Sequence, residues 1–203
     1  MGNTPESRSS LLLRLRDPRD RDAWDEFAVI YTPLIHRYCL RRGLQEADAA
    51  DVAQDAMFVV SQAIARFELR HVKGSFRSWL FKITRSALAD LCKRQRREPP
   101  AEGGTTLQRL IEDHPDPAID DLWDREYQQY MFDWACQQAR SEFEESTWQA
   151  FWCTAVKNLK GETVAQSLGI SLGAVYIAKS RVLARLKQLV GGVSDDSPFL
   201  EGH

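Results

Sequence analysis

Residues 159–190 constrain this chain most, because they read as two helices joined by one tight turn. Gly169 stands where a helix favours a left-handed residue at its end. Ser171 follows, and its side chain can cap a second helix by accepting a hydrogen bond from a backbone N–H. The apolar face of the first helix consists of Val164, Ala165 and Leu168.

The second helix of this stretch carries an apolar stripe at helical spacing, and its basic residues lie mostly off that stripe. The stripe consists of Val175, Ala178, Val182, Leu186 and Leu189. A helix-turn-helix of this kind presents its second helix to the major groove of DNA. The alternative is an ordinary helical hairpin in an all-α core. The short, glycine-containing turn favours DNA binding.

The composition is that of an ordinary globular protein, with 203 residues, 43% hydrophobic and 28% charged. We see no signal segment and no run of about eighteen apolar residues, so we expect a cytoplasmic protein without a membrane span. The cysteines form no CxxC pair, which indicates free thiols rather than a zinc site or disulfides. They are Cys39, Cys92, Cys136 and Cys153. Aromatic residues at helical spacing are typical of a core, so we assign no cofactor and no metal.

The net charge of −2 argues weakly against nucleic-acid binding, but the charges are segregated. Residues 77–97 are strongly basic, and residues 112–124 are strongly acidic. Blocks of one sign can steer a polyanion even when the total charge is near zero. The basic block is therefore a candidate contact for nucleic acid.

The first helical pattern covers residues 11–40 and contains Pro33, which predicts a kink or a boundary. A second helix is predicted over residues 48–67. Its buried stripe consists of Val52, Ala56, Val59, Val60, Ala63 and Phe67. Its other face is acidic and polar. Acids near a helix start favour the macrodipole, but this does not explain an acid two turns in. Such a face can dock a basic protein partner. It consists of Asp48, Asp51, Gln54 and Asp55.

Residues 68–75 predict a loop, and a basic, aromatic helix follows it. Bases of a single strand stack on aromatic rings while Arg and Lys hold the phosphates. Phe76 and Trp79 are equally compatible with core positions, and the residues alone leave this open. The candidate nucleic-acid contacts are Arg70, His71, Lys73, Phe76, Arg77, Trp79, Lys82 and Arg85.

Residues 99–120 are rich in Pro and Gly and predict a flexible linker. Two amphipathic helices are then predicted over residues 122–140 and 141–157, ahead of the helix-turn-helix. We find no convincing strand pairs. The fold class is therefore all-α, with two small helical domains over residues 9–98 and 121–190.

Together these residues resemble an extracytoplasmic-function (ECF, group 4) type sigma factor of bacterial RNA polymerase, within the sigma-70 family. Residues 9–98 are similar to sigma region 2, and residues 121–190 are similar to region 4. The most specific matches are DAADVAQDAMFVV (48–60), FRSWLFKITRSALADLCKR (76–94) and ETVAQSLGISLGAVYIAKSRVLARL (162–186). The linker leaves no room for the extra domain of larger sigma factors.

The resemblance implies a non-catalytic protein that directs core polymerase to promoters and assists their melting. It places Asp51, Gln54 and Asp55 where the family docks the clamp helices of the polymerase β′ subunit. The loop 68–75 falls where a base of the minus-ten element is captured, and the helix after it handles melting. Further implied partners are the β flap, promoter DNA and an anti-sigma regulator.

The second helix of the helix-turn-helix falls where the family reads the minus-thirty-five element. The positions implied are Ser171, Gly173, Ala174, Tyr176, Ile177, Lys179, Ser180 and Arg181. Two features depart from the family. Ser86 stands where Asn is common, and residues 176–178 replace a basic and polar run. Such apolar residues could meet thymine methyl groups or another protein.

Two rival functions follow from the same residues. A stand-alone helix-turn-helix regulator would need a dimer seam and would have no use for the acidic face. An enzyme is the third reading, because GISLG (169–173) formally matches the G-x-S-x-G nucleophile elbow. That motif needs a strand before it, and here a helix is predicted instead.

Overall fold

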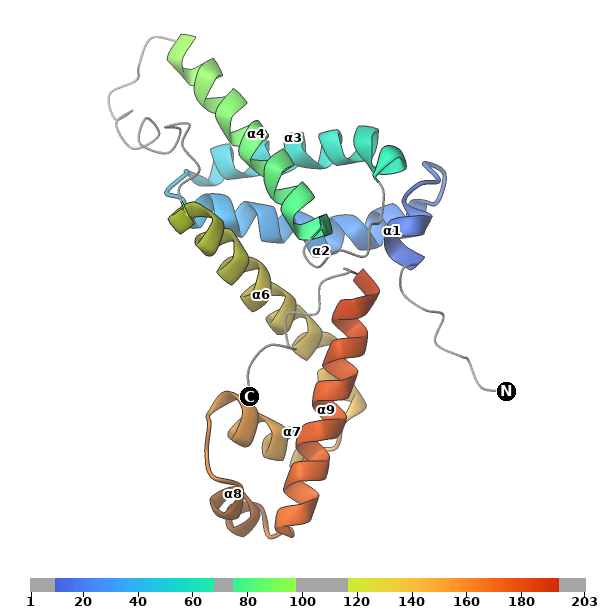
Figure 1. Ribbon diagram of the computed structural model, residues 1–203, viewed down its shortest axis with the longest axis vertical. Helices are drawn as coiled ribbons and strands as arrows, with labels where there is room; N and C mark the ends of the chain where they lie inside the picture. Colours follow the sequence, from blue (N-terminus) through green and yellow to red (C-terminus); the bar gives the residue numbers. More distant parts are fainter. Residues whose placement is uncertain (1–9, 68–74, 98–116, 194–203) are drawn as a thin grey trace. The chain divides into compact units, whose positions relative to one another are not determined.

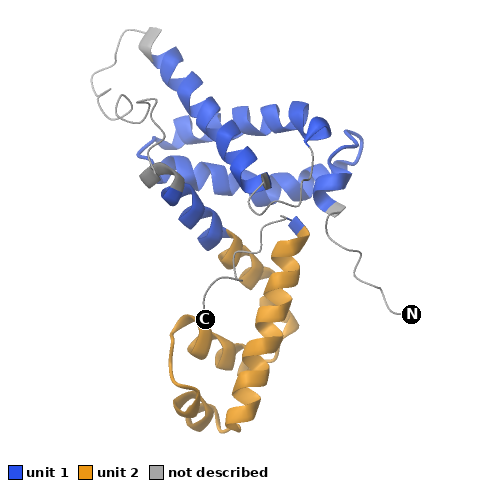
Figure 2. Cartoon of the chain, in the orientation of Figure 1, with its two compact units in different colours: residues 1–130, 193–196 blue, residues 131–192, 197–203 orange. Residues whose placement is uncertain are grey.

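A computed structural model describes residues 10–67, 75–97 and 117–193 (Figure 1). Every regular element in these ranges is helical, which confirms the predicted all-α fold. The chain divides into two compact units (Figure 2). Unit 1 is Met1–Tyr130 with Val193–Asp196, and unit 2 is Met131–Gly192 with Ser197–His203. The boundaries predicted from sequence, 9–98 and 121–190, stay predictions.

Unit 1 is built on two long helices that pack against a third. Helix α3 lies against both α2 and α4. The elements of unit 1 are α1 (Ser10–Arg14), α2 (Arg21–Arg41), α3 (Glu46–Ala63), η1 (Ile64–Arg66), α4 (Ser75–Arg97) and the first part of α6 (Pro117–Ala139). The α2 residues that face inward, such as Phe27 and Tyr31, are fully buried, so this helix contributes a large part of the core of unit 1.

The start of α2 is fixed by its N-cap. Asp20 accepts a hydrogen bond from the Ala23 backbone N–H at 3.0 Å and also receives two from Arg14 at 2.8 Å. This satisfies one of the donors that a helix start leaves free. No boundary occurs at Pro33, because α2 runs through it and the proline is exposed. Pro33 removes one hydrogen bond of the helix, and its exposed position lets water take the place of the missing donor.

One assignment in the predicted stripe of α3 is wrong. Val52, Ala56 and Val60 are buried as expected, but the Val59 side chain is 44% exposed. The periodicity placed Val59 beside Val60 on the core side, whereas α2 and α4 cover a narrower strip of the helix. Val59 therefore belongs to the surface, next to the exposed Phe58.

The first part of α6 belongs to the core of unit 1. The Trp123 side chain is 1% exposed, and its ring stacks on Phe81 with centroids 5.3 Å apart. The Tyr38 ring meets Trp123 edge-on at 5.0 Å. Glu126 is also buried and pairs with Arg37 at 2.9 Å. Residues 117–130 thus add a fourth long segment to the three helices before them.

Unit 2 contains the rest of α6, then several short helices, and finally the long helix α9 (Figure 2). Its elements after α6 are η2 (Arg140–Glu142), α7 (Glu145–Phe151), η3 (Trp152–Val156), α8 (Gly161–Leu168) and α9 (Leu172–Val193). The predicted helix over 141–157 is therefore divided. Its last part, η3, is a π-helix, in which the Thr154 hydroxyl donates to the Ala150 carbonyl at 2.6 Å.

The helix α6 begins at Pro117, inside the predicted linker 99–120. Proline suits the first position of a helix, because its missing N–H would have no partner there and its φ is already near the helical value. The residues before it, 98–116, lie outside the described part of the chain. The prediction that they form a flexible linker is therefore not tested.

Candidate nucleic-acid interface

The outer edge of α3 presents two of the predicted polar contacts to solvent. Asp51 and Gln54 are exposed, while Val52 and Ala53 between them are buried against the rest of unit 1. A helix turns by 100° per residue, so positions 51 and 54 share one side. This edge can meet a partner without any rearrangement of the core.

The other two acids of this face have partners on α4. Asp55 pairs with Arg94 at 2.6 Å, and Asp48 accepts a hydrogen bond from the Gln95 side chain at 3.0 Å. Asp55 therefore has a structural role that its sequence position did not indicate. The Asp55 pair is solvent-exposed, and such pairs contribute about 0–1 kcal/mol. A cationic side chain of a binding partner can therefore replace Arg94 at Asp55 with little loss of stability.

A shallow apolar groove runs along α3 and α4. Its lining includes Phe58, Val59 and Trp79, with Lys82 at one side. The Phe58 ring is 65% exposed and lies next to the exposed Val59, so the two form a small apolar patch. Trp79 is half-buried and lies on Phe67, with ring centroids 4.7 Å apart. Aromatic faces beside a cation are the combination on which single-stranded bases stack.

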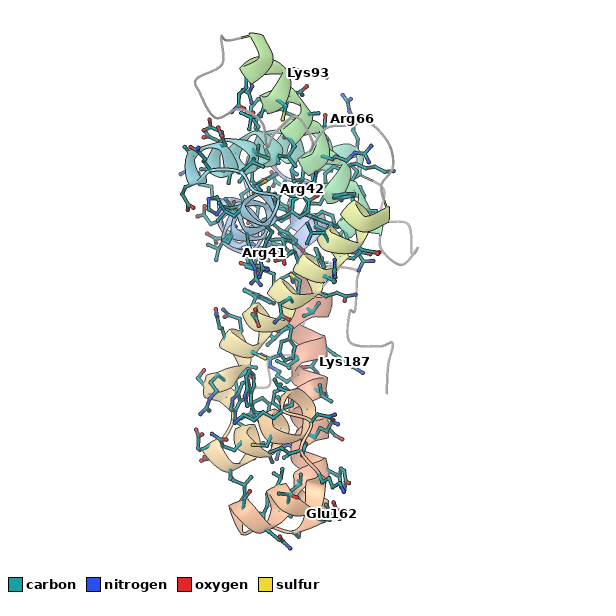
Figure 3. All side chains as sticks on the ribbon, turned by 90° about the vertical axis from the view of Figure 1, so that its left-hand side faces the viewer. Arg41, Arg42, Arg66, Lys93, Glu162 and Lys187 are labelled. Atoms are coloured by element: carbon teal, nitrogen blue, oxygen red, sulfur yellow. The ribbon has the colours of Figure 1, made fainter. Side chains whose placement is uncertain are left out.

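The cations of α4 differ in availability. Lys82 and Arg85 are exposed. Arg77 is half-buried, pairs with Asp124 of α6 at 3.2 Å and lies over the Tyr127 ring at 5.8 Å. Arg77 is therefore engaged by the protein itself. Near the end of α4, Lys93 is a further exposed cation (Figure 3).

The placement of Phe76 corrects one predicted contact. Its ring is completely buried and meets the rings of Phe27, Tyr31 and Phe67. A ring enclosed in this way has no face left for a base, so Phe76 is a core residue. The predicted contacts Arg70, His71 and Lys73 lie outside the described residues.

The turn of the helix-turn-helix has the geometry that the sequence predicts. Gly169 adopts a left-handed conformation with φ of +65°. The Ile170 N–H donates to the Ala165 carbonyl at 3.1 Å, and the Gly169 N–H donates to the Gln166 carbonyl at 3.4 Å. These two bonds form a Schellman motif, and Ile170 packs on the apolar cluster below, as that motif favours.

The second helix of this pair starts at its predicted cap. The Ser171 hydroxyl accepts a hydrogen bond from the Ala174 N–H at 3.1 Å. The two helices meet through a small shared core in which α7 also takes part. That core consists of Ala150, Val164, Ala165, Val175 and Ala178. The predicted stripe of α9 is buried throughout, including Val182, Leu186 and Leu189.

The opposite side of α9 is largely exposed. Tyr176 and Ile177 are 53% and 61% exposed, and Gly173, Ser180 and Arg181 are exposed too. Of the remaining predicted positions, Ala174 and Lys179 are half-buried and flank this side. The geometry therefore leaves the first turns of α9 open to a groove in a nucleic acid.

Neither a metal site nor a membrane-spanning helix is found in the described ranges. No cluster of three or more His, Cys, Asp or Glu side chains suited to a metal ion occurs in residues 10–67, 75–97 and 117–193. No helix in the same ranges has both the length and the apolar character needed to cross a membrane.

Residues 29–98, which include most of α2 and all of α3 and α4, match the model of the sigma-70 region 2 family. This part of the chain is thus similar to a sigma-70 region 2 domain. This match supports a sigma-70 family sigma factor with a role in promoter recognition by RNA polymerase. A search of curated proteins finds no match to the chain.

Two features of unit 1 were not predicted from the sequence. Phe58 was not among the predicted contacts. Its position outside the predicted buried stripe was a weak indication that its ring is exposed. Trp123 and Glu126 were taken for the C-terminal domain, but they pack on α2 and α4. A local sequence pattern does not predict these contacts, because the residues of α2 and α4 that make them lie far from residues 123–126 in the sequence.

Proposed function

We propose that this protein is an ECF-type sigma factor that directs core RNA polymerase to specific promoters. The observation that carries the proposal is the region 2 match over residues 29–98, in a chain whose second unit has an open helix-turn-helix. The assignment of residues 9–98 to region 2, 99–120 to a linker and 121–190 to region 4 is part of this proposal. The role requires binding and DNA opening, with no covalent step.

The polymerase contact is assigned to the acidic edge of α3. Asp51 and Gln54 are exposed and make the first contact with the clamp helices of the β′ subunit. Asp48 and Asp55 join them by exchanging Gln95 and Arg94 for groups of the polymerase. Charge complementarity of this kind speeds association and weakens as salt screens it.

Minus-ten recognition is assigned to the groove of unit 1. Trp79 offers a ring face, and Lys82 and Arg85 offer phosphate contacts. Unstacking a base costs a few kcal/mol, and stacking on an aromatic ring returns roughly 1–3 kcal/mol per base. Arg77 joins only if it leaves Asp124. The proposed site also includes Arg70, His71 and Lys73, which lie outside the described residues.

Minus-thirty-five recognition is assigned to the open side of α9. The helix would enter the major groove with its first turns, where Gly173, Tyr176 and Ile177 lie. Lys179 and Arg181 supply charge for phosphates. The same unit would contact the β flap of the polymerase. An anti-sigma protein is the proposed regulator, and the cytoplasm is the proposed compartment.

The test measures binding to core polymerase and transcription from a randomised promoter library. Asp51→Arg reverses an exposed charge at the proposed contact, and Asp25→Arg makes the same change on the exposed side of α2 as a control. We expect Asp51→Arg to weaken polymerase binding at least tenfold, which corresponds to about 1.4 kcal/mol. Asp25→Arg should bind like the wild type.

The same experiment separates the sigma factor from a stand-alone regulator. A sigma factor should bind promoter duplex poorly by itself and tightly with core polymerase. A stand-alone helix-turn-helix regulator should bind its duplex equally well in both cases. Tight, specific duplex binding by the free protein, with no effect of Asp51→Arg, would overturn the proposed function.

A further inference from the structure

The exposed residues of α9 form one continuous side of the helix. They follow each other at intervals of three and four, so they line up along the axis opposite the buried stripe. We call this side the outward face of α9. It consists of Gly173, Tyr176, Ile177, Ser180 and Arg181.

The beginning of the outward face is apolar. Tyr176 and Ile177 are its two large members, both more than half exposed. Arg181 supplies positive charge one turn further along, and Lys187 carries more at the far part of α9 (Figure 3). The face thus offers apolar groups where a recognition helix meets base edges and charge where it passes the phosphates.

Gly173 has no internal reason to be glycine. A Cβ added there would meet only the Ser171 hydroxyl, at 4.0 Å. Gly173 is the second residue of α9, where alanine would be the better helix former. Nothing in the described part of unit 2 requires a glycine here, so a ligand that approaches the helix backbone closely would give Gly173 a role. Gly173 lies one turn before Tyr176 and Ile177, on the same face.

Tyr176 is held in place by the neighbouring helix. A Cβ built on Gly161, the first residue of α8, would lie 3.1 Å from the Tyr176 hydroxyl oxygen and 2.9 Å from Leu172 Cδ1. The ring therefore rests directly on the α8 backbone at the first residue of that helix. A ring held this way loses little freedom when it binds a ligand.

The chemistry of base edges selects the ligand. In the major groove, the polar edges of guanine, adenine and cytosine are read by side chains such as Arg, Asn, Gln and Glu. Thymine alone adds an apolar group, its C5-methyl. A rigid ring and a β-branched side chain at adjacent positions match methyl groups and leave the polar edges without partners.

We propose that Tyr176 and Ile177 make this protein selective for thymines in the upstream promoter element, through their C5-methyl groups. The proposal rests on the proposed function, because it assumes that α9 enters the promoter. It specifies an element with thymine at one or two positions opposite the first turns of α9. Gly173 permits the close approach that brings the methyl groups into contact.

The experiment replaces thymine by deoxyuridine, which pairs identically but lacks the methyl group. The preferred upstream element is first selected from a randomised library with core polymerase. Each thymine in it is then changed singly, and initial transcription is measured. We expect about a fourfold loss for each contacted methyl, since burying one such group contributes about 0.8 kcal/mol. Changes between the two promoter elements should have no effect.

Two variants assign the methyl contacts to residues. Ile177→Ala should transcribe thymine and deoxyuridine templates equally well at one position, while the wild type still discriminates. Gly161→Ala should weaken discrimination at the Tyr176 position, because its methyl group displaces that ring. Val156→Ala removes another exposed apolar side chain of the same unit and should keep full discrimination.

The outcomes distinguish this inference from the proposed function. Selection of an upstream element without any effect of deoxyuridine would overturn the thymine proposal and leave the sigma role intact. An equal loss on both templates in Ile177→Ala would also overturn it, because the side chain would then act on the fold or on a protein partner. Failure to select any upstream element would count against the proposed function itself.

Discussion

Truncation of Trp123 tests whether the first part of α6 belongs to the core of unit 1. The side chain is 1% exposed and lies between Phe81 of α4 and Tyr38 of α2. In Trp123→Ala the ring is lost while the helix keeps a good helix former. The change therefore acts on packing and leaves helix propensity nearly unaltered.

The size of the effect follows from this burial. Removing a buried Trp typically costs about 3–5 kcal/mol. One term reduces the loss, because the buried indole N–H meets no acceptor among the described residues. An orphaned donor of this kind costs roughly 1–3 kcal/mol, which the alanine variant recovers. We expect a net loss of about 3 kcal/mol in Trp123→Ala and a smaller one in Trp123→Phe, which keeps a ring and removes the donor.

Hydrogen exchange measured by mass spectrometry gives the assay. A local loss of about 3 kcal/mol should speed amide exchange roughly a hundredfold in the first part of α6. The facing turns of α2 and α4 should exchange faster too. Exchange in α8 and α9 of unit 2 should stay the same. Gln128→Ala, on the exposed side of α6, controls for effects on the helix alone.

The result that would refute this reasoning is unchanged exchange in α2 and α4 together with a normal urea midpoint. It would mean that residues 117–130 do not pack on the helices before them in solution. The contacts of Arg77 with Asp124 and Tyr127 would then be absent as well. In that case Arg77 would be as available to DNA as Lys82.

Other variants test single features. Gly169→Ala should cost about 1–2 kcal/mol in thermal unfolding, because a side chain is strained at φ of +65°; no destabilisation would contradict the left-handed turn. Gly173→Ala should stabilise the fold slightly, because alanine is the better helix former, and yet reduce transcription; unchanged transcription would remove the argument for close approach. Burial raises the pKa of the Cys39 thiol to about 12, so this thiol should resist alkylation at pH 8 while the less buried Cys153 reacts first; equal rates would contradict the burial. The hydrogen bonds from Arg14 and then from the Ala23 N–H lower the pKa of Asp20, so its stabilising effect is present above pH 4 and lost as acid protonates it; an NMR titration midpoint at or above the ordinary value of about 3.9 would refute this.

The sequence alone predicted the features that depend on local rules. Gly169 and Ser171 mark the end of one helix and the start of the next through their own backbone and side-chain chemistry. The buried stripe of α9 follows from the helical period. Asp51 and Gln54 were predicted on a polar face and are exposed. Each of these depends on residues within a few positions of one another.

Only the tertiary structure decided which neighbour covers each face. Periodicity shows that Trp123 lies on an apolar side, but it does not say that Tyr38 and Phe81 will meet it. It also predicted that Val59 is buried, and it gave no indication that Arg94 pairs with Asp55. The physical reason is that a helix can bury its apolar side against any complementary surface. The choice among those surfaces depends on the packing of segments far apart in the chain, which no local pattern records.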